Sequence, residues 1–369
     1  MLDSSSTARH GQIQMRTTEG VPFMTHAKKH VPLVCFLMLV LMALSFGWAR
    51  GQSRIVLVAS GTSLPEPLYL RWNDEFHKQN EAVTIRYLPV GTENGADNIL
   101  TGSGDFAAGD APIPEKSLGS AKIPIAELPT VLIGIAIVYN VPGAPGDLRL
   151  TGSVLADIFL GKLKAWNDPE IAKLNPSASL PAIPIRVLHR TEGKGSNYIF
   201  SEYLAKESGE FSVKVGHGTS PKWPVGRSFN RTPDLLAAVK NTPGAIGYTE
   251  LNWGLNSGLR MAAIRNAAGE FVRPSERSIA AAATALESKM TKDFRVSLVN
   301  APGRESYPIA SFTWFYVPEY HQDSERGLAV KQFLEWVYTA GQGIAKEQGY
   351  ATLPSSILEK VKAQAAKIN

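Results

Sequence analysis

Cysteine is almost absent from this chain of 369 residues, and its scarcity excludes several kinds of chemistry. The single cysteine, Cys35, lies within the apolar run from Val31 to Phe46. Removal of that run with a leader would leave no cysteine to form a disulfide, to act as a thiolate nucleophile or to bind a metal ion. The mature chain is therefore expected to obtain any chemistry from other side chains.

Signatures of metal, nucleotide and hydrolytic sites are also missing. The histidines outside the leader, at 77, 189, 217 and 321, do not have the spacing of metal ligands. The Gly-Lys-Gly-Ser sequence at 193–196 lacks the upstream glycine of a nucleotide-binding P-loop, and it has no Gly-x-Ser-x-Gly setting. We therefore expect no catalytic residues, no metal and no cofactor, and a protein that binds rather than an enzyme.

Clusters of basic residues are absent as well. The chain has 38 Lys and Arg against 33 Asp and Glu, but these residues are dispersed and residues 1–51 carry part of the excess. A nucleic-acid-binding protein would be expected to concentrate its positive charge in one run or patch. We therefore expect no nucleic-acid partner.

Residues 1–51 are predicted to be an N-terminal extension followed by a secretory signal peptide. Two lysines precede the apolar run 31–46, and small residues follow it. The run is shorter than the roughly 20 residues that span a bilayer comfortably. A leader that starts at Met24 has conventional proportions, which makes Met24 a candidate for the functional start. We expect export to the periplasm, with secretion or an uncleaved membrane anchor as alternatives.

Apolar strands alternate with amphipathic helices along the rest of the chain. Two apolar runs, Thr130–Val138 and Tyr307–Val317, are expected to be buried strands that cross between two parts of the molecule. The alternation predicts an α/β fold with two lobes. We assign residues 52–138 and 306–369 to lobe I and residues 139–305 to lobe II.

The segment 187–200 is predicted to form half of an anion pocket. A strand delivers Arg190 to a loop in which Gly193 and Gly195 let the backbone approach a ligand, and Ser196 opens a helix. The planar guanidinium suits two oxygens of one tetrahedral anion. An ordinary strand-to-helix connection with a surface arginine is the alternative interpretation of this segment.

Further candidates occur in the N-terminal half of the sequence. Thr62, Ser63 and Thr92 offer hydroxyls at two strand-to-helix turns. Asp110 is informative because a carboxylate repels an anion unless that anion carries a proton to donate. Hydrogen phosphate has such a proton, whereas sulfate at neutral pH does not. If Asp110 faces the ligand, it selects phosphate; otherwise it is a turn residue that binds its own backbone.

Several motifs resemble those of the periplasmic phosphate-binding proteins that feed the ABC phosphate transporter. In chain order they are GTSLPEP at 61–67, GDFAAGDAP at 104–112, LADIFLGKLKAWNDPEIAKLNP at 155–176, KWPVG at 222–226, PGAIGY at 243–248 and YATLP at 350–354. The resemblance implies a type II periplasmic-binding-protein fold, with the ligand in the interlobe cleft and two crossing hinge strands. It also implies a monomer that captures inorganic phosphate and delivers it to an inner-membrane ABC permease.

The same resemblance assigns phosphate contacts to positions on both lobes. These are Ser63, Leu64, Thr92, Asp110, Arg190, Gly195 and Ser196. Ser63 and Leu64 would bind through backbone N–H groups, with the Ser63 hydroxyl as a further donor. Glu192 resembles the acidic residue that orients the arginine. Closing of the lobes would complete the coordination of the ion.

Three positions depart from the family's pattern. Lys194 stands where a phosphate-binding serine is common, Glu93 where a small hydroxyl residue is usual, and Leu64 where phenylalanine is common. We hypothesise that Glu93 and Lys194 pair across the closed cleft as a latch, or that Lys194 contacts the ligand. Two solvated loop charges are the alternative. The alternative functions are binding of arsenate, sulfate or another oxyanion, phosphate-ester hydrolysis, and extracellular adhesion.

Overall fold

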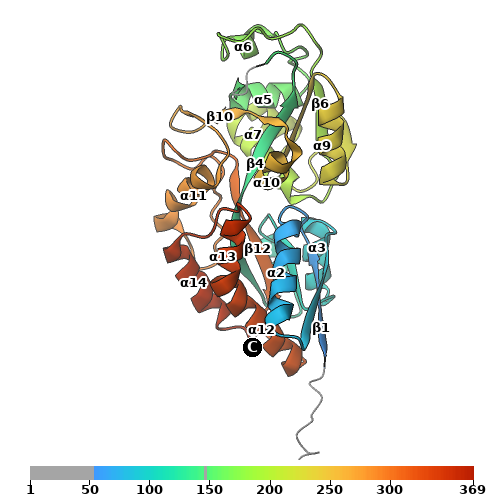
Figure 1. Ribbon diagram of the computed structural model, residues 1–369, viewed down its shortest axis with the longest axis vertical. Helices are drawn as coiled ribbons and strands as arrows, with labels where there is room; N and C mark the ends of the chain where they lie inside the picture. The colour runs from blue at the N-terminus through green and yellow to red at the C-terminus, as the bar shows by residue number, and fades with distance from the viewer. Residues whose placement is uncertain (1–53, 145–147) are drawn as a thin grey trace, which may run out of the picture. The chain divides into compact units, whose positions relative to one another are not determined.

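One long strand, β4 (Ile125–Asn140), connects the two parts of the main sheet in this computed structural model, which describes residues 54–144 and 148–369 (Figure 1). Residues 125–134 of β4 pair antiparallel with β12 (Ala310–Pro318), and residues 135–140 pair antiparallel with β8 (Ala245–Glu250). The strand therefore changes partner between Gly134 and Ile135. The predicted extension and signal peptide lie outside the described residues.

The strand order places the crossing in the middle of the sheet. The order is β2-β1-β3-β12-β4-β8-β6-β7, with β9 (Arg260–Met261) also beside β4. In one part, β1 (Ile55–Gly61), β2 (Val83–Leu88) and β3 (Phe106–Gly109) run parallel. In the other part, β6 (Arg186–Arg190), β7 (Arg227–Phe229) and β8 run parallel.

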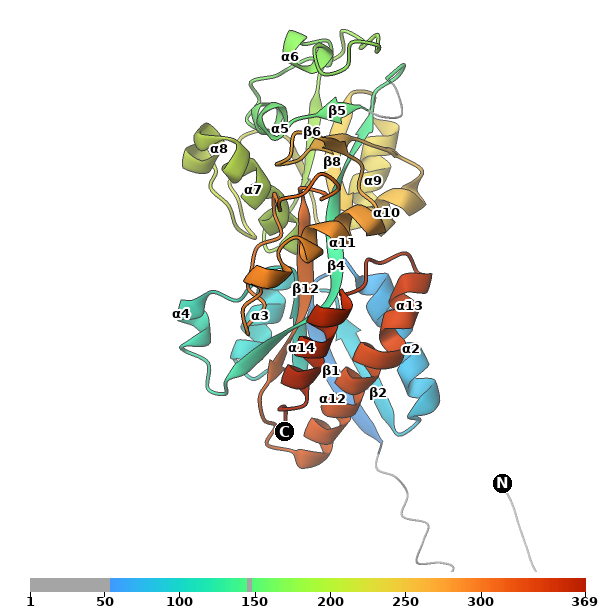
Figure 2. The same cartoon turned by 90° about the vertical axis from the view of Figure 1, so that its left-hand side faces the viewer.

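The segment that leads into β12 is the second crossing. The N–H of Ile135 donates to the carbonyl of Ile309 at 2.8 Å, so this segment continues alongside β4 where β4 changes partner. Figure 2 shows β4 and β12 running together between the two groups of helices. The predicted α/β architecture with two crossing strands is therefore confirmed. The exact limits that we assigned to the lobes remain a prediction.

Helices flank the sheet in both parts. The part of the sheet that holds β1, β2 and β3 is flanked by helices from both ends of the described chain. They are α2 (Glu66–Gln79), α3 (Thr92–Leu100), α4 (Glu115–Leu118), α12 (Ser324–Trp336), the π-helical η2 (Val337–Gly341), α13 (Gln342–Glu347) and α14 (Ser355–Ala365). The second part contains α5 (Gly152–Phe159), α6 (Pro169–Ala172), α7 (Gly195–Glu207), α8 (Gly209–Lys214), α9 (Thr232–Asn241), α10 (Leu251–Ser257), α11 (Glu276–Thr284) and the 3-10 turn η1 (Glu287–Lys289). A small sheet joins β5 (Arg149–Leu150), β10 (Ala263–Arg265) and β11 (Phe271–Val272).

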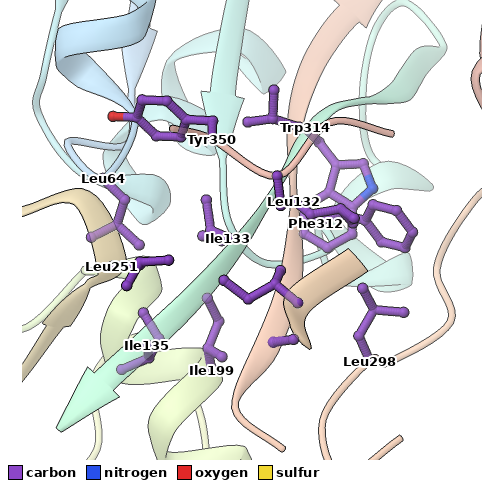
Figure 3. Close-up of a cluster of buried hydrophobic side chains, with 14 of the residues drawn as sticks. Leu64, Leu132, Ile133, Ile135, Ile199, Leu251, Leu298, Phe312, Trp314 and Tyr350 are labelled. Carbon is purple, nitrogen blue, oxygen red and sulfur yellow. The ribbon is translucent and has the colours of Figure 1, made fainter. Parts of the chain in front are cut away.

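Hydrophobic side chains from both parts belong to one core around the crossing strands. Figure 3 shows Leu132, Ile133 and Ile135 of β4 among buried side chains that include Leu64 and Leu251. The side chain of Leu64, at the predicted phosphate loop, is only 2% exposed and packs in this core. The loop that carries the candidate ligands is therefore anchored by apolar burial, which contributes about 1.5–3 kcal/mol for a leucine.

In the part of the chain that the structure describes, no helix is long and apolar enough to cross a membrane.

Candidate anion site

Arg190 ends β6 and is held in place by the loop between β7 and α9. Its Nε donates to the carbonyl of Phe229 at 3.3 Å, its Nη1 to the Thr232 hydroxyl at 2.6 Å, and its Nη2 to the carbonyl of Asn230 at 2.7 Å. The guanidinium is buried, and burial lowers its pKa. These contacts use three of the five donors of the guanidinium, so two N–H groups remain for an anion.

The prediction that Glu192 orients Arg190 is wrong. The Glu192 carboxylate pairs instead with Lys222 at 2.9 Å, and both side chains are exposed. Two backbone carbonyls and the hydroxyl of Thr232 already hold the guanidinium. The backbone of the β7–α9 loop therefore replaces the acidic partner that the resemblance implied.

Asp110 follows β3 and is completely buried, at 0% exposure. Its Oδ2 accepts hydrogen bonds from the hydroxyls of Thr62 and of Thr92, the latter at 3.3 Å. Its Oδ1 makes no hydrogen bond of good geometry among the described residues, although the Thr313 hydroxyl, which donates to the carbonyl of Gly109, lies near enough to lower the pKa of the carboxyl. Burial raises the pKa of Asp110 to about 6, although the hydroxyl hydrogen bonds and the charge of Arg190 act in the opposite direction. At neutral pH this buried side chain is therefore a carboxylate, and its Oδ1 has no hydrogen bond among the described residues.

The N-terminus of α7 lies directly against this carboxylate. A Cβ atom on Gly195 would lie 2.3 Å from Oδ2 of Asp110 and 2.6 Å from the Thr92 hydroxyl. Only glycine fits at this position, which brings the second part of the chain to Asp110. The next residue, Ser196, is buried, and its hydroxyl has no partner among the described residues. The structure thus brings together Thr92, Asp110, Gly195 and Ser196 as predicted candidates.

The helices that begin around these residues have open N-termini. No side chain caps α2, α3, α7 or α9, whose N-cap residues are Pro65, Gly91, Lys194 and Arg231. Their first N–H groups therefore have no side-chain acceptor, although the N–H of Glu93 in α3 donates to the carbonyl of Gly193. The positive dipole ends of such helices favour a nearby anion. The side chains of Thr151, Ser275 and Asp323 cap α5, α11 and α12, whereas α4, α13 and α14 also lack a side-chain cap.

The resemblance implies that the loop after β1 binds phosphate through the N–H groups of Ser63 and Leu64, but one of these two N–H groups has another acceptor in the structure. The Leu64 N–H donates to the Thr62 hydroxyl at 3.1 Å, so that donor already has an acceptor within the loop. The carbonyl of Leu64 accepts from Nε1 of Trp253 at 3.1 Å, which links this loop to α10. Ser63 lines a cavity of about 540 Å³ together with Lys194 and Thr232.

Glu93 and Lys194 do not form the ion pair that we hypothesised. Oε2 of Glu93 accepts from the hydroxyls of Thr219 and Ser220, each at 2.9 Å. Lys194 is 9% exposed, and among residues 54–144 and 148–369 no hydrogen bond or ion pair of its amine is found. Burial and the nearby charge of Arg190 lower the pKa of Lys194. Glu93 still reaches the second part of the chain, but through neutral hydroxyls that cost less to desolvate than a buried ion pair.

The sequence reasoning missed three contributions to the site. The sequence indicates that Thr62 is a turn hydroxyl, but its role as the partner of Asp110 depends on β1 and β3 being adjacent. Thr232 stands at the start of a helix, which is the one local signal that it could have offered. Thr219 and Ser220 lie in an irregular loop with no pattern that predicts their contact with Glu93.

No cluster of three or more histidine, cysteine, aspartate or glutamate side chains that could hold a metal ion occurs among the described residues. The polar groups assembled here are hydroxyls, N–H groups, one guanidinium and one carboxylate. Such a set can bind an oxyanion that carries a proton.

Comparison with known proteins gives a consistent set of relatives. A family model described as "PBP superfamily domain" matches residues 48–340. The phosphate-binding protein PstS of Xylella fastidiosa is 34% identical over 316 residues, which cover 85% of this chain and 86% of the relative. The protein of the same name from Pasteurella multocida is 35% identical over 309 residues, covering 84% and 89%. That of Methanocaldococcus jannaschii is 34% identical over 329 residues, covering 83% and 84%.

Solved structures give the same fold. A high affinity periplasmic phosphate-binding protein bound with phosphate matches with a TM-score of 0.66 and 19% identity, covering 84% of this chain and 93% of that one. The phosphate binding protein from Stenotrophomonas maltophilia matches with a TM-score of 0.63 and 18% identity, over the same shares of the two chains. At these identities the likeness establishes the fold.

Proposed function

This chain belongs to the PstS family of phosphate-binding proteins within the PBP superfamily, and from that premise we propose that it captures inorganic phosphate. In this proposal, its type II periplasmic-binding-protein fold holds the ligand between the two lobes. The phosphate is then delivered to an inner-membrane ABC permease, and the protein acts in the periplasm as a monomer. The names of its relatives and the predicted leader support this role.

The free oxygen of the buried Asp110 carboxylate is the observation that carries the proposal. A buried carboxylate oxygen without a partner is costly, typically by about 1–3 kcal/mol or more. Hydrogen phosphate removes this cost by donating its proton to Oδ1. Its other oxygens accept from Arg190, from the buried hydroxyl of Ser196 and from the open N-terminus of α7. The ligand therefore satisfies groups that the protein leaves unpaired.

The phosphate contacts in this proposal come from both parts of the chain. They are Ser63, Leu64, Thr92, Asp110, Arg190, Gly195 and Ser196, with Lys194 as an additional ligand. The Leu64 N–H and the Thr92 hydroxyl would exchange their bonds to Thr62 and Asp110 for bonds to phosphate. Lys194 replaces a neutral hydroxyl with a cation, so it partly offsets the negative charge of Asp110. The offset favours a dianion over a monoanion at this site.

Calorimetric titration at pH 7.5 tests the proposal. The protein, purified from cells that express the full chain and dialysed free of phosphate, is expected to bind phosphate at least 100-fold more tightly than sulfate. An Asp110→Asn variant is expected to lose most of that difference, because an amide can donate to sulfate. Equal affinities of the wild-type protein for phosphate and sulfate would contradict the role of Asp110.

Two other functions are separated by simple controls. Hydrogen arsenate carries a proton like hydrogen phosphate but is a larger ion. Competition between arsenate and phosphate therefore measures how well the site distinguishes the two ions by size alone. Hydrolysis is tested by incubating the pure protein with p-nitrophenyl phosphate. We propose capture without turnover, and release of nitrophenol by the wild-type protein but not by the Asp110→Asn variant would overturn it.

A further inference from the structure

A buried ion pair holds the loop that follows Asp110. Both backbone groups of Ile113 are bound: its N–H donates to Oε1 of Glu127 at 2.6 Å, and its carbonyl accepts from Nη2 of Arg295. Nε of Arg295 donates to Oε2 of Glu127 at 2.5 Å, so the two charged side chains close around one residue of the loop. Glu127 lies on β4, whereas Arg295 belongs to the segment between η1 and β12. The ion pair therefore fixes the backbone just beyond Asp110.

The segment that carries Arg295 is also bonded to α7, the helix that begins at the proposed phosphate site. The Ser297 hydroxyl donates to Oε1 of Glu202 at 2.6 Å and accepts from Nζ of Lys206 at 3.0 Å. Both of these partners lie on α7. The strap, as we term residues 294–300, therefore connects α7 to the loop that follows Asp110.

The backbone of the strap is held in an uncommon conformation at both ends. Phe294 and Asn300 have φ angles of 56° and 57°, which residues other than glycine adopt only where the surrounding structure fixes them. Phe294 is 2% exposed and packs in the main core, and Nδ2 of Asn300 donates to Oε1 of Glu207 at 2.8 Å. The core and α7 thus fix the turn that presents Arg295 to Glu127.

Asp110 is held from its own part of the sheet as well. Two hydroxyls of β12 donate to the carbonyls on either side of it, from Thr313 to Gly109 at 3.1 Å and from Tyr316 to Ala111. These bonds fix the loop on β12. The strap contacts both the loop and α7, so it also fixes the loop relative to that helix.

We propose that Arg295 is a positioning residue for phosphate recognition. Through the strap it sets where the Asp110 carboxylate lies relative to the start of α7, and so whether one anion can donate its proton to Asp110 while it accepts from Ser196. An O–H···O hydrogen bond requires a distance of about 2.5–3.0 Å between its oxygens, so a small displacement of the loop reduces selectivity as well as affinity. This role rests on the proposed function, because it concerns the same ligand.

Calorimetry with phosphate and sulfate at pH 7.5 tests this role on the dialysed protein from full-chain expression. Arg295→Gln leaves Glu127 without its cation and releases the carbonyl of Ile113. We expect the phosphate Kd to rise at least tenfold, and the ratio of the sulfate Kd to the phosphate Kd to fall at least fivefold. Arg295→Lys keeps a charge beside Glu127 but lacks the planar fork that also reaches Ile113, so both quantities should lie between those of the wild-type protein and of Arg295→Gln.

Arg326 provides the matched control, because its guanidinium also binds a buried carboxylate next to the β1–β3 part of the sheet. Its Nε and Nη2 donate to the two carboxylate oxygens of Asp105 at 2.7 and 2.6 Å, and Nη2 donates to the carbonyl of Val56 at 2.9 Å. Asp105 is 5% exposed. Arg326→Gln is expected to lower the Tm of the phosphate-free protein about as much as Arg295→Gln does, and to change the ratio of the two Kd values less than twofold.

The outcomes separate positioning from stability. An unchanged ratio in Arg295→Gln, or an equal fall in Arg326→Gln, would mean that the ion pair only stabilises the fold and would overturn the proposal. If Arg295→Gln does not fold, Arg295→Lys decides: a fall of the ratio by at least twofold supports the proposal, and the wild-type ratio overturns it. Failure of the wild-type protein to bind phosphate would instead remove the proposed function, and the role of Arg295 with it.

Discussion

At Gly195 the backbone of α7 lies directly against Asp110 and Thr92, so this residue sets how closely the two parts of the chain approach. Gly195→Ala would place a methyl group 2.3 Å from Oδ2 of Asp110. Overpacking of this kind costs about 1–3 kcal/mol, which corresponds to a rise in the phosphate Kd of about 5–150-fold.

Calorimetry measures the effect of Gly195→Ala, and thermal unfolding without phosphate shows whether the fold is kept. The matched control is Gly209→Ala at the start of α8, where an added Cβ meets nothing within 4 Å. Phosphate binding by Gly195→Ala at the wild-type affinity would show that the contact with Asp110 opens in the bound protein.

Burial raises the pKa of Asp110, and the Thr62 hydroxyl opposes this effect by donating a hydrogen bond to Oδ2. Thr62→Val removes this donor, and hydrogen bonds to charged groups contribute about 1.5–3 kcal/mol. We expect phosphate affinity to fall about tenfold or more, together with a smaller preference over sulfate. Thr62→Ser retains a hydroxyl and should bind nearly as the wild-type protein does. If the serine variant loses as much affinity as the valine variant, the methyl group rather than the hydroxyl matters.

The titration of Asp110 predicts how selectivity depends on pH. Its pKa is raised to about 6, so above pH 6 the carboxylate accepts the proton of phosphate and repels sulfate. Below pH 6 the protonated group can donate to a sulfate oxygen. Sulfate affinity is therefore expected to rise between pH 7.5 and pH 5, and calorimetry at several pH values checks this. The Asp110→Asn variant should show a flat profile, and a parallel rise in that variant would assign the effect to another group.

Single residues of the site could be predicted from sequence only where strand, loop and helix are consecutive. Arg190, Gly195 and Ser196 follow each other along one connection, so their types and order already indicate an anion pocket. The partners of Arg190 come from residues 229–232, some forty positions later, and nothing local distinguishes their carbonyls. The wrong assignment of Glu192 has the same origin, because an adjacent carboxylate is the nearest partner in sequence but not in space.

At the scale of elements, α10 lies between the buried side chain of Glu250, which caps it, and the loop after β1, which Trp253 contacts. The side chain of Glu250 caps this helix by accepting from the N–H groups of Asn252 and Trp253 at 3.0 and 3.4 Å. Burial raises the pKa of Glu250 to about 8. The helix in turn presents Trp253, whose indole donates to the carbonyl of Leu64. The protonation of Glu250 is therefore linked to an element that lines the proposed site.

The sign of this linkage predicts a pH-dependent stability. The pKa of Glu250 is higher in the folded chain than its ordinary value of 4.5, so the folded state binds the proton more tightly. The free energy of unfolding is expected to fall as pH rises from about 4.5 to 8, by at most about 1.4 kcal/mol per pH unit. Denaturant unfolding of the phosphate-free protein at pH 6, 7 and 8 measures it.

The control for this effect is Glu250→Gln, which keeps an acceptor oxygen and cannot ionise. Asp110, with a pKa of about 6, contributes a fall of the same sign only below that pH. The variant should therefore have a nearly constant stability between pH 6 and 8. An unchanged slope in the variant would mean that another group titrates in this range.

Helices and strands could be predicted from sequence where the hydrophobic pattern lies within the segment itself. Leu68, Trp72 and Phe76 repeat every four residues and are buried along α2 as expected. The two apolar crossings were also evident, because a strand buried on both faces has no polar alternation. The position of β12 between β3 and β4 was not predictable, since a pairing between residues about 200 apart leaves no mark on either segment alone.

For the whole molecule, α3 makes direct hydrogen bonds to the second part of the chain. The Glu93 carboxylate accepts from Thr219 and Ser220, and the N–H of Glu93 donates to the carbonyl of Gly193 at 3.2 Å. These bonds join α3 to the loop before α7 and to the loop after α8. Their loss should favour opening and speed the release of phosphate.

A double-mutant cycle on phosphate Kd decides which partner of Glu93 matters. Glu93→Ala and Ser220→Ala are expected to couple by about 0.5–3 kcal/mol, because their side chains are in direct contact. Glu93→Ala and Lys194→Ser should be additive within about 0.5 kcal/mol, since those side chains do not pair. A larger coupling with Lys194 than with Ser220 would restore the latch that the structure does not show.

The place of β12 in the sheet also determines the order in which the protein can be completed. This strand lies between β3 and β4, yet it is made about 170 residues after β4 ends. Until residue 318 is available, the edges of β3 and β4 have no strand between them, and exposed edges are prone to pair with other chains. Non-local pairing of this kind slows folding. A chain truncated before residue 310 is therefore expected to aggregate rather than to form half of the protein, even though its N-terminal strands are all present.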